Sequence, residues 1–309
     1  MNIIFMGTPE FAIPSLAMLA ASDNNILGVV TQPDRPRGRG KKLHPPPIKT
    51  LAQQHGLSVI QPVGVKEENF IKSLKGQNPD LIVVVAFGQI LPPKILRVPH
   101  HGCINLHASL LPAYRGAAPI NWALINGEET TGVTTISMSE WMDTGDILLK
   151  KEIEIEKTDD ALSLSHRLST LGAKLLLETI RQLKKGDLSS TPQDHSKASY
   201  APALKKEDGN IEWKMDAQGI YNQIRGTVPW PGAITNLDNR LFKILKSKVI
   251  EEENQEPPGK ISQVSPEGIK VATGKSYLLL TEVQLQDRKR MKAAEFVRGH
   301  PIPIGTMLI

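Results

Sequence analysis

The sequence predicts two domains: an α/β domain with a mostly parallel sheet, followed by a small all-β barrel. The chain has 309 residues, and a single hydrophobic core rarely grows that large, so two domains are expected. Apolar strand segments alternate with helical segments in the first half, as in βαβ units with right-handed crossovers. After residue 208 the pattern changes to short strands separated by turn residues.

The first domain opens with a buried strand at residues 2–6, and Pro9 suits the first turn of a helix over about 10–21. The apolar run LIVVVAF is rich in β-branched residues, as in parallel strands buried on both faces. The expected elements that follow the first helix are a strand at 26–31, a helix near 47–55, a strand at 58–62, a helix at 66–77, the strand LIVVVAF at 81–87 and a strand at 102–107.

The pattern is less regular after residue 118. We expect a helix at 119–128, two strands at 132–139 and 147–155 that flank the loop EWMDTGD, and an amphipathic helix at 159–186 with leucines at three- and four-residue spacing. We therefore set the first domain at residues 1–189.

Residues 190–208 are polar and rich in Ser and Pro, which predicts a linker. Residues 209–309 hold one helical stretch and about five short strands. This content is typical of an OB-like barrel.

Composition limits the class of protein. The chain is 40% hydrophobic and 22% charged, and no apolar run reaches the ~20 residues that span a bilayer. The N-terminus lacks the basic region of a signal peptide, and the single cysteine, Cys103, excludes an internal disulfide. We expect a cytoplasmic protein without a membrane partner, and nothing demands more than a monomer.

Two hydrogen-bonding side chains interrupt the apolar strand INLH. Because side chains alternate along a strand, Asn105 and His107 face the same side, at the carboxyl edge where open α/β sheets bind ligands. Together they could stabilise an oxygen that becomes negative when an acyl carbon turns tetrahedral. The alternative is that both are satisfied by nearby backbone and only cap the strand.

A carboxylate beside His107 would favour and orient the imidazolium. The loop WMDTGD offers Asp143 and Asp146, although either could be an ordinary turn aspartate. The residues alone leave this choice open.

Other chemistries are less supported. The histidines near residue 100 lack a metal-ligand pattern, so we expect no metal. Cys103 and His107 lie four residues apart on one strand, roughly 13 Å, so they cannot form a nucleophile pair, and Cys103 is expected to be a buried hydrophobe. GTPEF has one glycine after the first strand, which does not support a nicotinamide dinucleotide.

Positive charge concentrates in DRPRGRGKKLHPPPIK, residues 34–49. This segment alone carries a net charge equal to the +5 of the whole chain. It predicts a flexible loop that is ordered by phosphates, and the alternative is a solvated charged loop. The residues expected to contact nucleic acid are Arg35, Arg37, Arg39, Lys41 and Lys42.

With these residues assembled, the sequence resembles the folate-dependent formyltransferase family. NLHASLLPAYRGAAPI followed by MDTGDIL is similar to that family's signature, and the basic segment and PWPGA are similar to its branch that acts on charged tRNA. The resemblance covers essentially the whole chain. It implies a Rossmann-like first domain and an OB-like tRNA-binding barrel.

The resemblance also implies a reaction: transfer of the formyl group of 10-formyltetrahydrofolate to the α-amine of methionine esterified to initiator tRNA. It assigns Asn105, His107 and Asp143 to catalysis, and Arg39 to a loop that enters the acceptor arm. The residues expected to bind the folate are Ser109, Leu110, Leu111 and Pro112, with Phe87, Gln89 and Leu91 near the pterin.

Three alternatives share parts of this pattern. A formyltransferase acting on a small amine, such as a sugar nucleotide or glycinamide ribonucleotide, would share the three catalytic residues without needing the basic segment. A 10-formyltetrahydrofolate hydrolase would use water as acceptor. A non-catalytic RNA-binding module would not need the three residues at all.

Overall fold

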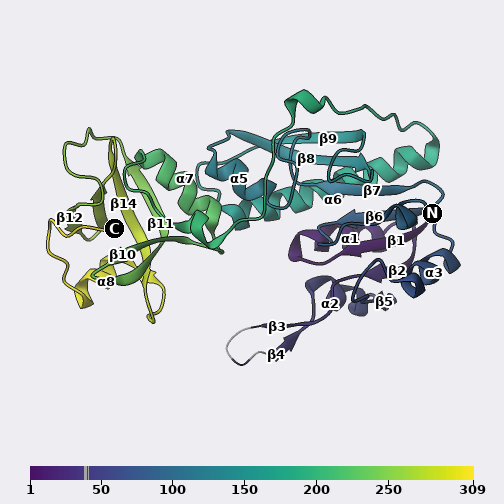
Figure 1. Cartoon of the computed structure of the whole chain (residues 1–309), viewed down its shortest axis with the longest axis horizontal. Coiled ribbons are helices and arrows are strands. Elements are labelled where there is room, and N and C mark those ends of the chain that lie inside the picture. The colour runs from purple at the N-terminus through teal and green to yellow at the C-terminus, as the bar shows by residue number, and fades with distance from the viewer. Residues whose placement is uncertain (38–39, 41) are drawn as a thin grey trace. The chain divides into compact units, whose positions relative to one another are not determined.

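The structure is a computed structural model that describes residues 1–37, 40 and 42–309. The chain forms two compact units (Figure 1). Unit 1 comprises residues 1–119, 130–154 and 165–201, and unit 2 comprises residues 120–129, 155–164 and 202–309.

Unit 1 is built on a seven-stranded sheet whose first five strands are parallel, as the βαβ pattern predicted. The last two strands run antiparallel to their neighbours. In sheet order the strands are β5 (Val59–Ile60), β2 (Asn25–Val30), β1 (Asn2–Gly7), β6 (Leu81–Val85), β7 (Cys103–His107), β8 (Thr130–Ser137) and β9 (Ile147–Glu154).

Helices pack on this sheet through apolar positions at helical spacing. On one face, Phe70 and Leu74 join Ile4, Ile82 and Cys103 in a single core cluster. The long helix α6 approaches β7 closely, since a Cβ added at Gly172 would lie 2.7 Å from the Leu106 side chain. The helices of unit 1 are α1 (Ile13–Ala20), preceded by the 3-10 turn η1 (Glu10–Ala12), α2 (Pro47–Gln54), α3 (Glu68–Gly76), α4 (Pro93–Leu96) and most of α6 (Ala161–Lys185). Nearly all of α5 (Pro119–Ile125) belongs to unit 2.

The basic segment differs from its prediction. Instead of a loop without regular structure, its flanks form an antiparallel pair of strands, β3 (Arg35–Arg37) and β4 (Lys42–His44). Arg35 pairs with His44 and Arg37 with Lys42. The physical reason is local: the flanks pair through their backbones, and this pairing requires no side-chain burial.

Unit 2 is an antiparallel sheet, which confirms the predicted all-β domain. Its path is β10 (Ala233–Leu237), β11 (Arg240–Ile250), β14 (Tyr277–Leu285), β13 (Gly268–Ala272) and β12 (Ile261–Ser265), and β15 (Met291–Lys292) pairs with β14. The C-terminal residues join the two edges of this path. Ile309 exchanges hydrogen bonds with Asn236 of β10, while Ile261 donates its backbone N–H to Thr306. Both edges are thereby paired, as in a barrel.

The interior of unit 2 is apolar and contains Phe242 and Phe296, whose ring centroids lie 5.3 Å apart. Asp216 caps its helix by accepting a hydrogen bond from the N–H of Gly219. The helical elements of this unit are η3 (Lys206–Gly209), α7 (Ala217–Thr227) and α8 (Ala293–Gly299).

The first residues of the predicted linker are hydrogen-bonded to unit 1. Thr191 and Ile147 exchange two backbone hydrogen bonds, of 2.8 and 2.9 Å. Arg115 donates its N–H to Ser199 and accepts one from Ala201, and the 3-10 turn η2 (His195–Lys197) lies between these contacts. The division at residues 189 and 209 stays a prediction. No helix in the described part of the chain is long and apolar enough to span a bilayer.

Candidate active site

Three polar side chains meet at the carboxyl end of β7. Asn105 Nδ2 lies 3.4 Å from Asp143 Oδ1, and His107 Nδ1 lies 3.6 Å from the same oxygen. Asn105 and His107 therefore share a face of the strand, as their two-residue spacing predicted. Asp143 reaches them from the loop between β8 and β9.

The histidine and the aspartate are nearly sealed from solvent, with side chains 6% and 10% exposed. His107 Nε2 lies 2.9 Å from the carbonyl oxygen of Tyr114. Since a carbonyl only accepts, Nε2 carries a hydrogen, and Nδ1 is the nitrogen that faces the carboxylate. Asp143 Oδ2 accepts the backbone N–H of Gly116 at 2.9 Å.

The geometry separates the two candidate aspartates. Asp143 faces the Asn–His pair, whereas Asp146 Oδ2 accepts a hydrogen bond from Ser190 Oγ at 3.3 Å. Asp143 also has a φ of +55°, in the left-handed region that residues with a Cβ rarely adopt. Strained conformations of this kind gather at functional sites.

A second layer of side chains lies behind Asp143. Gln193, 6% exposed, donates to the carbonyl oxygens of Asp143 and Gly145, and it accepts from the guanidinium of Arg115. Sequence reasoning missed both residues. Arg115 stands out as the one charge in the apolar run LLPAYRGAAPI, but Gln193 lies in a polar stretch that gave no signal.

The turn SLLP is held by hydroxyl groups. Ser109 Oγ donates to the carbonyl of Ala113 at 2.6 Å. Thr134 Oγ1 donates to the carbonyl of Ser109 and accepts the N–H of Leu111. Ser109 and Leu111 are buried, while Leu110 and Pro112 are partly exposed, so the exposed half of the turn is what a ligand could reach.

The segment after β6 contributes differently from what its side chains suggest. Phe87 and Leu91 belong to the hydrophobic core of unit 1, so their side chains are committed to packing. Gln89 accepts the N–H of Val65, and the carbonyl of Phe87 accepts a hydrogen bond from Thr8 Oγ1 at 2.8 Å. The Ile90 side chain of this segment is 65% exposed, and folate contact by Phe87, Gln89 and Leu91 stays a prediction.

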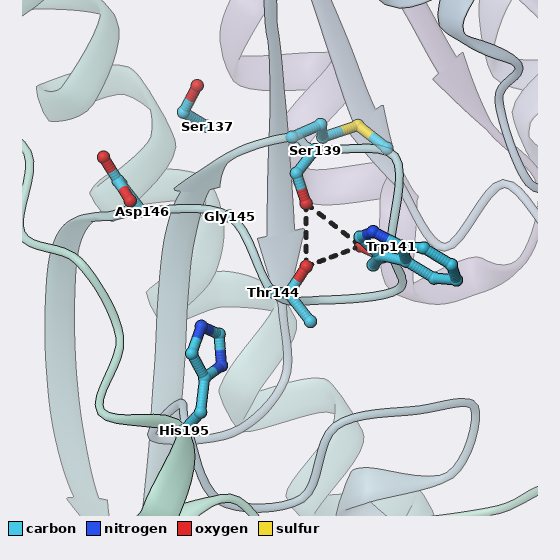
Figure 2. Close-up of a pocket in the computed structure, with 8 residues that line it drawn as sticks. Ser137, Ser139, Trp141, Thr144, Gly145, Asp146 and His195 are labelled. Carbon is cyan, nitrogen blue, oxygen red and sulfur yellow. Dashed lines mark hydrogen bonds between the residues drawn. The ribbon is translucent and has the colours of Figure 1, made fainter.

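A pocket of about 410 Å³ lies on the loop that carries Asp143. Figure 2 shows Ser139 and Thr144 bonded to each other and to the carbonyl of Trp141, which fixes this loop from within. The lining residues are Ser137, Met138, Ser139, Trp141, Thr144, Gly145, Asp146 and His195. The Trp141 side chain is 79% exposed.

The described part of the basic segment is exposed. Arg35 and Lys42 lie open to solvent on β3 and β4, and Arg37 lies in β3. Arg39 and Lys41 fall outside the described residues. At the base, Asp34 accepts from Lys49 Nζ at 2.8 Å and from Gln61 Nε2 at 2.8 Å.

These contacts at the base decide where the free charge lies. The hydrogen bond from Gln61 and then the ammonium of Lys49 lower the pKa of Asp34, so this carboxylate is ionised at neutral pH and balances Lys49. The unbalanced positive charge of the segment is therefore confined to residues 35–42.

Unit 2 gathers basic residues from two sequence clusters. Strand register places Lys246 of β11 and Lys292 of β15 on either side of Glu282 in β14. Arg290 donates to both carboxylate oxygens of Glu282, and this hydrogen bond lowers the pKa of Glu282. Three cations thus surround one carboxylate beside a pocket of about 300 Å³.

Cys103 takes no part in the site. It is buried at 3% exposure, and this burial raises the pKa of its thiol to about 12. The prediction of a buried small hydrophobe is confirmed. In the described parts of the chain, no three His, Cys, Asp or Glu side chains are grouped so that they could hold a metal ion.

Comparison with known proteins agrees with this geometry. Residues 1–180 match the family model described as formyl transferase, and residues 203–301 match the model of the formyl transferase C-terminal domain. The methionyl-tRNA formyltransferase of Citrifermentans bemidjiense is 50% identical over 308 residues, covering 100% of this chain and 96% of the relative. That of Clostridioides difficile is 47% identical over 308 residues, covering 100% of both chains.

Solved structures share the fold at lower identity. The sugar 3N-formyl transferase WlaRD has a TM-score of 0.68 at 17% identity, over 94% of this chain and 99% of its own. HypX from Aquifex aeolicus has a TM-score of 0.68 at 17% identity over 99% of this chain, which spans 48% of HypX. The two family models together cover most of the sequence, and the chain belongs to the formyl transferase family.

Proposed function

We propose that the protein transfers the formyl group of 10-formyltetrahydrofolate to the α-amino group of methionyl-initiator tRNA, giving N-formylmethionyl-tRNA for translation initiation. The observation that carries the proposal is the convergence of Asn105, His107 and Asp143. The acceptor is supported by the full-length relatives, which are named methionyl-tRNA formyltransferases. A cytoplasmic location and a monomeric state are part of the proposal.

The reaction is direct acyl transfer. The neutral amine attacks the formyl carbon, and the carbonyl oxygen becomes negative in the tetrahedral intermediate. Asn105 has a second amide hydrogen beyond the one aimed at Asp143, and this hydrogen can bind the oxyanion. The His107 ring, 6% exposed, lies beside this donor, where its N–H groups add to the electrostatic stabilisation of the oxyanion. The attack forms the new C–N bond, and collapse of the intermediate restores the carbonyl and breaks the bond to the folate nitrogen.

Proton balance gives Asp143 its role. The attacking amine loses one proton and the departing folate nitrogen gains one, so the net transfer is internal to the two substrates. Asp143 accepts the proton from the amine and returns it to the folate nitrogen, directly or through water, and its carboxylate orients His107 through Nδ1. No covalent enzyme intermediate is required, because the formyl donor is already activated.

The folate is assigned to the face of the sheet that Asn105 and His107 share. The turn Ser109–Pro112 follows β7 and residues 87–91 follow β6, and these neighbouring parallel strands end at the same edge of the sheet. A related fold, that of HypX, has been solved in complex with tetrahydrofolic acid, which supports this choice of donor.

Two basic surfaces are proposed to bind the tRNA phosphates. One is the β3–β4 hairpin with Arg35, Arg37, Arg39, Lys41 and Lys42. The other is the cluster of Lys246, Arg290 and Lys292 on unit 2. Exposed cations bind the backbone of nucleic acid without reading its sequence.

One assay tests the proposal. Incubation with formyl-labelled 10-formyltetrahydrofolate and methionyl-tRNA should make label acid-precipitable with the initiator species and not with elongator tRNA. Label transferred only to small amines would identify the sugar or ribonucleotide formyltransferase instead. Release of free formate without any acceptor would identify the hydrolase, and either result would overturn the proposal.

A further inference from the structure

The loop that carries Asp143 is held in a conformation that it would not adopt alone. A residue with a Cβ rarely adopts a left-handed φ, and such a conformation persists only when the surroundings over-determine it. Asp143 has such a φ, +55°. Gly145 is equally constrained, since an added Cβ would lie 1.7 Å from the carbonyl oxygen of Ser137. Some group must hold this backbone in place.

Gln193 is that group. Its Nε2 donates to the carbonyl oxygen of Asp143 at 2.8 Å and to that of Gly145 at 2.7 Å. The two hydrogens of one buried amide thereby hold the carbonyl groups of Asp143 and Gly145, the residues on either side of Thr144. These bonds reach across 50 and 48 residues of sequence, so they fix the loop relative to the rest of unit 1.

Arg115 fixes the direction in which the amide points. A guanidinium has only donors, so its bonds of 3.2 and 2.7 Å require the oxygen of Gln193 to face Arg115 and the nitrogen to face the loop. The Arg115 side chain is 3% exposed, and among the described residues no carboxylate lies within ion-pair distance of it. Its remaining acceptor is His195 Nδ1 at 3.0 Å.

The same stretch of chain also holds the other end of Asp143. The N–H of Gly116, the residue after Arg115, donates to Asp143 Oδ2 at 2.9 Å. Gly116 has a φ of +123°, and an added Cβ would lie 2.6 Å from the carbonyl oxygen of Ala201. Arg115 and Gly116 thus hold Asp143 twice, at its carboxylate directly and at its backbone through Gln193.

We propose that Gln193, oriented by Arg115, is a positioning residue that aims the carboxylate of Asp143 at Asn105 and His107. The inference rests on the proposed function for the role of those three residues. It extends the active site to the segment after α6, which makes no contact with the three side chains itself. A displacement of about 1 Å at a reacting group can cost ~100-fold in rate, so loss of this support should appear in kcat.

Two substitutions distinguish a role of Gln193 in orienting Asp143 from a role in packing alone. Gln193→Glu keeps an oxygen for Arg115 but replaces the two N–H donors with an oxygen that faces two carbonyls. Gln193→Met keeps the volume and removes both functions. We expect both variants to lower kcat by about 10- to 100-fold, with KM for folate and for tRNA within about threefold of the parent. Lys197→Gln, an exposed change in the same segment, is the matched control and should behave as the parent.

A purely structural role of Gln193 predicts a different result for Gln193→Glu. If Gln193 only anchors the segment through Arg115, Gln193→Glu keeps that anchor and should retain the parent kcat, which would overturn the proposal. Loss of kcat that merely follows a loss of folded protein, measured by Tm and active-site titration in both variants, would also overturn it.

Hydrogen exchange measures the rigidity of the loop that carries Asp143 and tests the same inference without any substrate. Amides in the peptide that covers residues 141–146 should exchange faster in Gln193→Glu and Gln193→Met and at the parent rate in Lys197→Gln. Unchanged exchange in this peptide overturns the inference whatever the formyl acceptor is. Failure of the wild-type protein to formylate methionyl-tRNA would overturn the proposed function alone.

Discussion

At the scale of single residues, the active site depends on side chains that are costly to bury and are placed where they meet partners. His107 donates from Nε2 to the carbonyl of Tyr114 and presents Nδ1 to Asp143. Asn105 occupies the neighbouring position on the same face of β7. Each of the three groups is therefore satisfied by the others or by backbone, and the remaining hydrogen of Asn105 is available to a substrate oxygen.

Asn105→Ala tests the role of that hydrogen. Losing one donor to a developing oxyanion typically costs about 10²- to 10³-fold in kcat, and we expect a loss of this size with a small change in KM. Steady-state kinetics with labelled folate and methionyl-tRNA measures it. Asn236→Ala, at an exposed position of β10, is the control, and near-normal turnover by Asn105→Ala would refute the oxyanion role.

Cys103 should be almost inert in the native protein. Burial raises the pKa of its thiol from 9.0 to about 12, so the thiolate fraction at pH 9 falls by about three orders of magnitude. Alkylation by iodoacetamide at pH 9 should therefore be at least about a thousandfold slower in native than in urea-unfolded protein. A native rate close to the unfolded rate would show that the thiol is exposed or activated.

The raised pKa of the Cys103 thiol also makes the free energy of unfolding depend on pH. Because the folded pKa lies above the unfolded value, the thiol contributes fully below pH 9, and its contribution is lost as the pH rises toward 12. The unfolding free energy of Cys103→Ala should accordingly fall less steeply than that of the parent across this range.

Individual residues were predictable where strand periodicity applies. Alternation alone placed Asn105 and His107 on one face. It could not choose between Asp143 and Asp146, because that choice depends on a loop fold in which Asp146 turns to Ser190. Nothing local marked Gln193, whose partners lie 48 to 78 residues away.

At the scale of elements, the basic segment has one property that the sequence predicted and one that it did not. Its positive charge was evident from sequence, but its pairing as the β3–β4 hairpin was not. The hairpin is tied at its base by Asp34, Lys49 and Gln61. These contacts order the base of the hairpin before it binds a partner. Its cations are therefore presented with little further loss of chain entropy on binding.

Removing two exposed cations of this hairpin should weaken tRNA use. The double variant Arg35→Ala/Lys42→Ala is expected to raise KM for methionyl-tRNA, leave KM for folate unchanged, and reduce the salt dependence of binding by about one phosphate contact per residue. Filter binding at several salt concentrations measures the slope, with Lys66→Ala as an exposed unit 1 control. Arg39→Ala, outside the described residues, should also weaken tRNA use, and an unchanged kcat/KM for charged tRNA would contradict this.

At the scale of the whole molecule, each unit has its own core and closes its own edges. Unit 1 ends its parallel sheet with the antiparallel strands β8 and β9. Unit 2 depends on its C-terminal residues, since Leu308 is 1% exposed in the core and its backbone donates to Gly259. The C-terminal residues form an isolated bridge, between Met307 and Lys260, rather than a strand, and they complete the barrel through these backbone contacts.

Leu308→Ala tests this closure. A large-to-small change in a core costs about 2–5 kcal/mol of unfolding free energy. We expect that loss in urea denaturation, together with faster hydrogen exchange in β10 and β12, whose edges the C-terminal residues join. Ile309→Ala, at a side chain 71% exposed, should have little effect, and equal effects of the two variants would argue against the closure.

The sequence by itself determined the fold class, the order of the elements and the shared face of Asn105 and His107. These follow from periodicity and composition, which are local properties of a chain. The tertiary structure alone decided which aspartate joins the pair, how the basic clusters of unit 2 meet around Glu282, and that Gln193 supports Asp143. Such contacts join residues far apart in sequence, and only packing and register bring those residues together.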